Sequence, residues 1–143
     1  MLGNLHDGVF HKKYIGNTAA GQDGSSVAST AIATAGFKRI RVVIELGAVT
    51  SNAVLKASIS ACDTSSGEFA DIASLGTDGV VLTGKSDNTV IIDAPLGVGC
   101  EFVKINYQRT TANIELDAIT FDLYDARVVP VTQDTTVAKV VAL

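Results

Sequence analysis

Tryptophan is absent from this chain, and histidine and cysteine each occur only twice. Cys62 and Cys100 have neither C-x-x-C spacing nor a histidine nearby, which excludes a recognisable zinc or redox motif. We expect two buried, reduced thiols. No stretch approaches the roughly 18 apolar residues that span a bilayer, and the first ten residues lack a basic leader, so we expect synthesis in the cytoplasm and no membrane association.

The two histidines, His6 and His11, both lie in a glycine-rich leading segment. A Ser-His-Asp or Cys-His catalytic site would therefore depend on the part of the chain with the least pattern, and we expect no such site. Contact with a partner or with solvent is the expected role of these histidines.

Clustered positive charge is also missing. The densest basic stretch is Lys38-Arg39-x-Arg41, whereas nucleic-acid binding requires clusters interleaved with aromatic residues. Residues 1–59 carry six Lys or Arg against three acids, and residues 60–143 carry five against twelve. This asymmetry favours association with another protein over association with nucleic acid.

One stretch imitates a nucleotide-binding motif. Residues 79–86 satisfy G-x-x-x-x-G-K-[ST], the phosphate-loop pattern, and Val90-Ile91-Ile92-Asp93 resembles a magnesium-binding strand. The variable positions are Val, Val, Leu and Thr, which favour an extended strand, and no helix follows. A parallel neighbour would need a crossover of a dozen or more residues, so we expect a hairpin (strand 80–83, turn 84–88, strand 89–92) and no nucleotide.

Apolar and polar residues alternate with a period of two along most of the chain, and turn-forming segments recur every eight to twelve residues. Such a pattern predicts an all-β, single-domain antiparallel β-sandwich, plausibly a jelly-roll. The alternation predicts buried side chains at Ile40, Val42, Ile44, Leu46, Leu55, Ala57, Ile59, Ala61, Val103, Ile105, Tyr107, Ile119, Phe121 and Leu123.

Three segments follow from this pattern. Residues 1–26 contain five glycines and no sustained alternation, which predicts an irregular N-terminal arm. Residues 27–130 form the predicted sandwich, and residues 131–143 form a β-prone C-terminal tail.

Four acids in one strand, Glu115, Asp117, Asp122 and Asp125, raise the question of a metal or acid-base site. Strict alternation would place Asp122 on the face opposite to Asp117 and Asp125. We therefore interpret these carboxylates as outward or strand-end charges that aid solubility, and expect no metal and no cofactor.

The segments "GEFADIAS" and "EFVKINYQRTTANIELDAITFDLYDARVVPVTQD" resemble the body of small head decoration, or cement, proteins of tailed bacteriophages. The matching residues are Phe102, Val103, Ile105, Tyr107, Leu116, Ala118, Ile119, Leu123, Tyr124, Arg127, Pro130 and Val131. The resemblance covers about the last two-thirds of the chain. It implies a jelly-roll-like sandwich without catalytic residues, hence no enzyme.

The resemblance implies a virion structural protein that binds the exterior of an assembled capsid through the major capsid protein, as a homodimer, homotrimer or other small homo-oligomer. Two alternatives stay open. A neck or tail protein of a phage would have a similar composition, and a carbohydrate-binding or adhesion module would share the sandwich fold. The carbohydrate-binding alternative would usually show exposed Trp or Tyr for sugar stacking, whereas this chain has no Trp and three Tyr.

Apolar residues at both ends of the chain are the predicted partner contacts. They stand among Gly, His and Lys at the front and continue to the last residue at the back. Such segments of high β-propensity can add a strand to a neighbouring sheet edge, although folding back onto their own sheet is equally open. The predicted contact residues are Phe10, Tyr14, Ile15, Val137, Val140, Val141 and Leu143.

Overall fold

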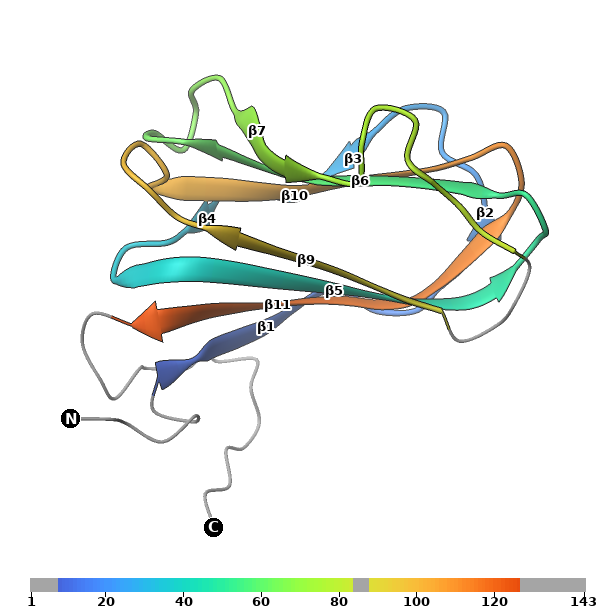
Figure 1. The fold of residues 1–143 in the computed structure, drawn as a ribbon, viewed down its shortest axis with the longest axis horizontal. Helices are drawn as coiled ribbons and strands as arrows, with labels where there is room; N and C mark the ends of the chain where they lie inside the picture. Colours follow the sequence, from blue (N-terminus) through green and yellow to red (C-terminus); the bar gives the residue numbers. More distant parts are fainter. Residues whose placement is uncertain (1–7, 84–87, 127–143) are drawn as a thin grey trace, which may run out of the picture.

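The computed structural model describes residues 8–83 and 88–126, and it shows two antiparallel β-sheets packed face to face (Figure 1). The predicted all-β sandwich is confirmed. None of the described residues forms a helix that is long and apolar enough to cross a membrane.

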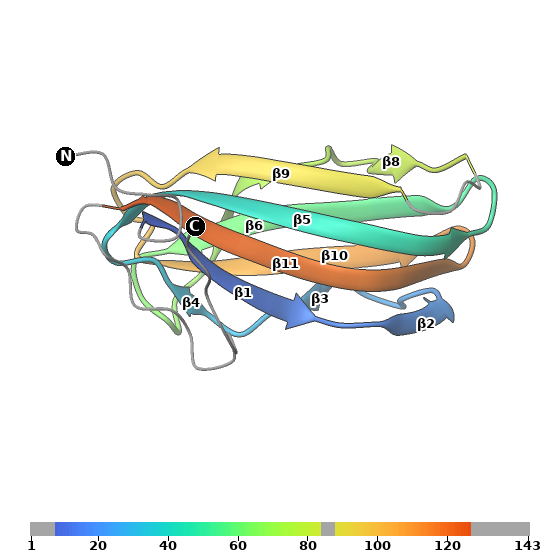
Figure 2. The same ribbon diagram turned by 90° about the horizontal axis from the view of Figure 1, so that it is seen from below.

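The first sheet has the order β1-β11-β5-β9, with β2 continuing the line of β1 along β11 (Figure 2). Its strands are β1 (Phe10–Ile15), β2 (Thr18–Gly21), β5 (Phe37–Val49), β9 (Thr89–Pro95) and β11 (Ile114–Ala126).

The second sheet has the order β3-β10-β6-β7, with β4 continuing β3 along β10 and β8 continuing β7 along β6. Its strands are β3 (Val27–Ala28), β4 (Ile32–Ala33), β6 (Val54–Cys62), β7 (Ala70–Ser74), β8 (Val80–Val81) and β10 (Phe102–Thr110).

The connectivity is that of a jelly-roll. If the broken pairs β1/β2, β3/β4 and β7/β8 are each counted as one strand, the chain has eight strands. Their sheet orders are then first-eighth-third-sixth and second-seventh-fourth-fifth, the two interleaved Greek keys of a jelly-roll.

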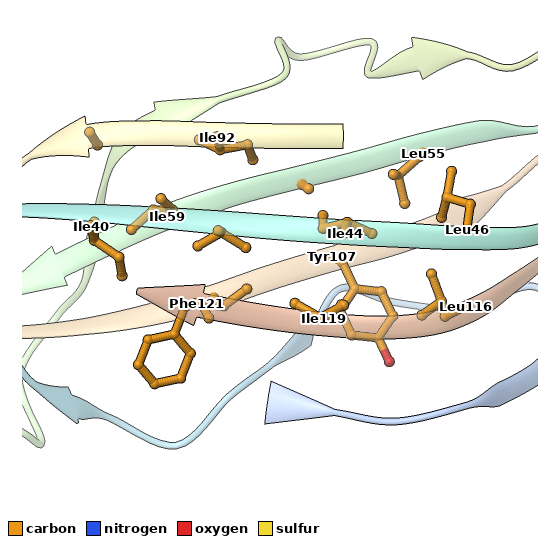
Figure 3. Packing of buried hydrophobic residues seen from close by; sticks show 14 of the residues in the cluster. Ile40, Ile44, Leu46, Leu55, Ile59, Ile92, Tyr107, Leu116, Ile119 and Phe121 are labelled. Carbon is orange, nitrogen blue, oxygen red and sulfur yellow. The ribbon is translucent and has the colours of Figure 1, made fainter. Parts of the chain in front are cut away.

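The core lies between the sheets and consists mainly of Ile, Leu and Val (Figure 3). The four longest strands each alternate in burial, because side chains of an extended chain point to opposite faces in turn. All fourteen side chains that the alternation predicted to be buried are at most 8% exposed. These side chains thus confirm the predicted inward phase of the four strands.

The predicted hairpin over residues 80–92 is wrong. β8 pairs with β6 in the second sheet, whereas β9 pairs with β5 in the first, so the chain crosses between sheets after β8. Local sequence favoured a tight turn, but each strand finds a long central partner elsewhere. Residues 84–87 lie outside the described part of the chain.

The leading segment contains more order than the prediction of an irregular arm over residues 1–26 allowed. β1 and β2 form an edge of the first sheet, and Phe10, Tyr14 and Ile15 pack against the core. Glycines at positions 16 and 21 interrupt the alternation without preventing pairing with β11. The sandwich therefore begins before residue 27, while the predicted tail over 131–143 lies outside the described residues.

Candidate functional site

A groove of about 550 Å³ opens at one side of the sandwich, and we call it the lateral groove. It lies between β1 at the edge of the first sheet and the β3–β4 segment at the edge of the second. Its lining residues are Phe10, Lys12, Lys13, Tyr14, Ala28, Ser29, Thr30, Ala31, Ile32, Ala33 and Phe121. On the opposite side of the sandwich, β7 and β9 contact each other across the sheets.

Aromatic side chains gather along this opening. Phe10 packs against Phe37 and Phe121, with ring centroids 6.3 and 6.4 Å apart. Tyr14 meets Tyr107 edge to face at 6.4 Å. Five of the eight aromatic residues of the chain thus lie at the side where the sandwich is least closed. Phe121 and Tyr107 are buried, whereas Phe10 and Tyr14 are partly exposed and offer apolar area to a partner at the groove.

The groove owes its width to a break in the edge of the second sheet. Between β3 and β4, Ser29 holds β10 with both its backbone and its side chain. Its N–H donates to the Ile105 carbonyl, and its Oγ accepts from the Ile105 N–H, each at 2.9 Å. The Ser29 hydroxyl takes the place of a backbone carbonyl as the acceptor for the Ile105 N–H. The chain at Thr30 and Ala31 can therefore turn away from β10 while this N–H of β10 keeps a hydrogen-bond partner.

Tyr14 lines the lateral groove, and the neighbouring Tyr107 is buried in the core. Burial raises the pKa of the Tyr14 hydroxyl, and the neighbouring Tyr107 raises it further. Burial also raises the pKa of Tyr107, with a smaller contribution from the charge of Asp23. Because its pKa is raised above the ordinary tyrosine value, the Tyr14 hydroxyl is neutral over the physiological range.

A buried ion pair fixes the segment that follows β2. Arg109 donates from Nε to Asp23 Oδ2 at 2.9 Å and from Nη2 to Asp23 Oδ1 at 3.0 Å, a bidentate arrangement. Its Nη1 also donates to the carbonyls of Ala19 and Ile114, at 2.9 and 3.0 Å. The side chains of Arg109 and Asp23 are only 8% and 12% exposed. This pair ties residues 19–23 to β10 and β11, and no local sequence pattern marks it.

The ion pair makes stability depend on pH in the acid range. Hydrogen bonds from Arg109 hold the pKa of Asp23 below its ordinary value. A carboxyl with a lowered pKa stabilises the fold above its unfolded pKa, and this contribution is lost as the pH falls through the folded pKa. We therefore expect the free energy of unfolding to fall between about pH 5 and pH 2.

Urea unfolding over that range measures the effect. Asp23→Asn should flatten the acid limb, whereas Asp78→Asn, in an exposed turn, should leave it unchanged. Identical acid limbs in the parent and in Asp23→Asn would contradict this prediction.

The outer face of the first sheet is occupied by paired charges. His11, Asp122, Arg41 and Asp93 stand in one register row across β1, β11, β5 and β9. His11 Nδ1 lies 2.6 Å from Asp122 Oδ1, and Asp93 accepts from Arg41 Nε at 3.3 Å.

Asp93, the residue that resembled a magnesium ligand, is the centre of this charge network. It accepts from Arg39 Nη2 at 2.7 Å and from the Tyr124 hydroxyl at 2.5 Å. Partial burial raises the pKa of Asp93, but the hydrogen bonds from Tyr124, Arg39 and Arg41 outweigh burial and lower the pKa overall. Its two carboxylate oxygens thus already accept hydrogen bonds from side chains of the neighbouring strands β5 and β11.

The acids of β11 do not follow the strict alternation that the sequence predicted. The register between β11 and β5 shifts on either side of Leu116, and both Leu116 and Ile119 are buried. This irregularity changes the phase of the strand, so that Asp117 and Asp122 both lie off the core. Within residues 8–83 and 88–126, no three His, Cys, Asp or Glu side chains are grouped so that they could hold a metal ion.

Phe10 and Tyr14, two of the predicted partner contacts, line the lateral groove, and Ile15 packs against the core opposite Ile119. Val137, Val140, Val141 and Leu143 lie outside the described residues.

Sequence reasoning missed Ile32 and the Ser29 break, because residues 27–33 show only short apolar runs. Cys62 and Cys100 are free thiols, but they are partly exposed where burial was expected.

No model of a known protein family matches this chain, and no curated protein matches it. Among solved structures, the K1 cleaved adhesin domain of Lys-gingipain from Porphyromonas gingivalis is 10% identical, with a TM-score of 0.44 over 78% of this chain and 71% of that chain. Eiger TNF from S. frugiperda is 7% identical, with a TM-score of 0.42 over 89% and 99%. Neither similarity bears on what this chain binds.

Proposed function

We propose that this chain is a virion structural protein that binds the exterior of an assembled phage capsid and braces the shell. The lateral groove is the observation that carries the proposal, because it offers an apolar, aromatic-lined binding surface on a rigid sandwich. The resemblance to phage decoration proteins supports it, since most of the matching residues lie in β10 and β11.

The partner is an extended apolar segment of the major capsid protein. The groove follows β1, where Phe10, Lys12 and Tyr14 alternate on the side toward the interior. An extended chain laid along it would place every second side chain against these rings, the geometry of strand recognition. Lys13 adds positive charge, which complements an acidic residue in the incoming segment.

The mechanism is mechanical. A protein that binds only the assembled shell stabilises that shell in proportion to the logarithm of its free concentration over the dissociation constant. The fold suits this role, because every buried side-chain nitrogen and oxygen of the described residues has a hydrogen-bond partner. A dimer or trimer of the chain would bridge several capsid subunits at once and add avidity.

The copy number in purified particles tests the location. Quantitative mass spectrometry should find the chain in proportion to the subunits of the shell. A number equal to a single ring of subunits would favour the neck or tail alternative. Absence of the chain from purified particles would contradict both assignments.

A groove variant tests the binding surface. The full-length Phe10→Asp variant, added to shells that lack the protein, should fail to co-sediment and should not raise the thermal midpoint of the shell. Ile91→Asp is the matched control, because Ile91 is 54% exposed on β9, at the opposite edge of the first sheet. Circular dichroism establishes that both variants are folded. Wild-type binding by a folded Phe10→Asp protein would show that the groove is not the contact.

A further inference from the structure

A second groove, of about 320 Å³, lies on the outer face of the second sheet, and we call it the polar groove. It runs over β6 and β10, the two long central strands. Its lining residues are Ser26, Lys56, Ala57, Ser58, Asp71, Ser74, Gly76, Thr77, Asn106, Tyr107 and Gln108. The volume falls at the lower end of the range for small-ligand pockets, about 300 to 1,000 Å³.

The groove exists because the strands on either side of it are interrupted. β7 ends at Ser74, and the Leu75 N–H still donates to the Ala57 carbonyl at 3.0 Å. The turn that follows, before β8 begins at Val80, leaves the edge of β6, and Gly76 and Thr77 in it line the groove. Gly79 makes this turn possible: its φ is +72°, and a side chain there would come within 2.6 Å of the Leu55 carbonyl oxygen. On the other side, β3 covers β10 over two residues only.

The polar side chains of this groove are held in fixed orientations by their neighbours. Asn106 Nδ2 donates to Ser58 Oγ at 3.3 Å and to Ser60 Oγ at 3.0 Å. The Ser58 hydroxyl keeps its proton for donation to a ligand, and the carbonyl oxygen of Asn106 keeps its acceptor capacity, whereas Ser60 is buried and only orients Asn106. Gln108 Nε2 donates to the backbone carbonyl of Asp23 at 3.4 Å, which leaves Gln108 Oε1 as an acceptor.

At the β7 edge of the groove, another serine hydroxyl accepts a hydrogen bond and keeps its own proton. Ser74 Oγ accepts from the Gly76 N–H at 3.2 Å, so the Ser74 hydroxyl proton is also available to a ligand. Lys56 adds a cation and Asp71 an anion, so the lining carries no net charge. The groove therefore presents hydroxyl donors, amide acceptors and one charge of each sign within one hollow.

The geometry points to a neutral saccharide of one or two rings as the ligand of the polar groove. Each sugar hydroxyl both donates and accepts, which matches the mixture of serine hydroxyls and amide oxygens. Pre-oriented polar groups lower the entropic cost of binding. Lys56 and Asp71 carry opposite charges, so the lining has no net charge that would favour an anion or a cation over a neutral ligand.

Recognition here rests on hydrogen bonds, because Ala57 and Tyr107 border the groove but their side chains belong to the buried core. Tyr107 is only 6% exposed, so no aromatic face is available for stacking. We therefore expect dissociation constants in the millimolar range. The polar groove and the lateral groove share no lining residue, so capsid binding and saccharide binding can succeed or fail separately.

Amide chemical shifts of the full-length protein test the inference. Maltose, lactose and N,N′-diacetylchitobiose are titrated separately to millimolar concentrations, with sialic acid and inorganic phosphate as anionic probes. At least one neutral sugar should shift amides of residues 56–60, 74–77 and 106–108 in a saturable manner. Asn106→Ala should weaken that binding about three- to tenfold, the effect of one or two lost hydrogen bonds.

The matched control is Asn113→Ala, an asparagine replaced on the exposed turn before β11, and it should bind as the parent does. Three results would each overturn the inference: no groove shifts with any neutral sugar, unchanged affinity in a folded Asn106→Ala protein, or binding of the anionic probes alone. Saturable shifts that map only to the lateral groove would overturn it as well.

Discussion

Arg109→Ala will lower the free energy of unfolding by about 3 to 5 kcal/mol, the cost of breaking a buried ion pair by removing one partner. The substitution leaves the Asp23 carboxylate, 12% exposed, without its cation, and it removes the donor to the Ala19 and Ile114 carbonyls. The bond between the Asp23 N–H and the carbonyl of residue 109 would remain, but residues 19–23 would lose the side-chain part of their tie to β10. Urea denaturation measures the loss.

Further variants distinguish the free energy of the Arg109–Asp23 interaction from the other effects of removing the Arg109 side chain. Arg109→Lys keeps the charge but loses the planar fork, so it should rescue only part of the stability. A double-mutant cycle with Asp23→Ala should give a large coupling free energy. Arg39→Ala, in a more exposed pair with Asp93, is the comparison and should have a much smaller effect. A loss below about 1 kcal/mol for Arg109→Ala, as in surface pairs, would contradict the assignment.

Phe121→Ala will lower the free energy of unfolding by about 3 to 5 kcal/mol, as expected for a large-to-small change in a core. Phe121 is 2% exposed in the central strand β11, and its ring packs on Phe10. Because Phe121 also lines the lateral groove, the truncation removes packing between the two sheets and support for the predicted contact surface at once.

The thermal midpoint is the simplest measurement of this loss. Phe121→Leu should retain most of the stability, because it keeps an apolar side chain of moderate volume. Ile91→Ala, at an exposed position of β9, should change the midpoint little. An unchanged midpoint in Phe121→Ala would mean that the inward phase of residues 119–123 is wrong.

The alternation of β5, β6, β10 and β11 predicted the sandwich and most of its core from sequence. These strands are long, and each has one apolar face, so periodicity alone determines which side chains are buried. The edge strands gave no such signal. β3, β4 and β8 have two residues each, and their places depend on the long strands that they pair with.

Two of the structural errors have one physical origin. A hairpin over 80–92 and strict alternation through 115–125 are both inferences from local sequence. The structure replaces the first with a crossover between sheets and interrupts the second with a register shift near Leu116. Tertiary pairing overrides local turn and strand preferences when a long central strand is available.

The candidate sites were less predictable than the fold. Phe10 and Tyr14 stood out as apolar residues in a polar leading segment, and both line the lateral groove. Ser29, Asp23 and Arg109 gave no local signal, because their partners lie more than 70 residues away. The polar groove depends on two strand interruptions on separate edges, which a linear sequence does not bring together.

The strand order also determines when this chain can fold during its synthesis. β11 lies between β1 and β5, and β10 lies between the β3–β4 segment and β6. β10 and β11 therefore leave the ribosome after most of the strands that pair with them. More than a hundred further residues must be translated before β1 can pair with β11. Until then the nascent chain exposes unpaired strand edges, which are open to association with other chains. Neither sheet can be completed until translation has passed β10 and β11, so the sandwich closes late, and by long-range pairing that is intrinsically slow.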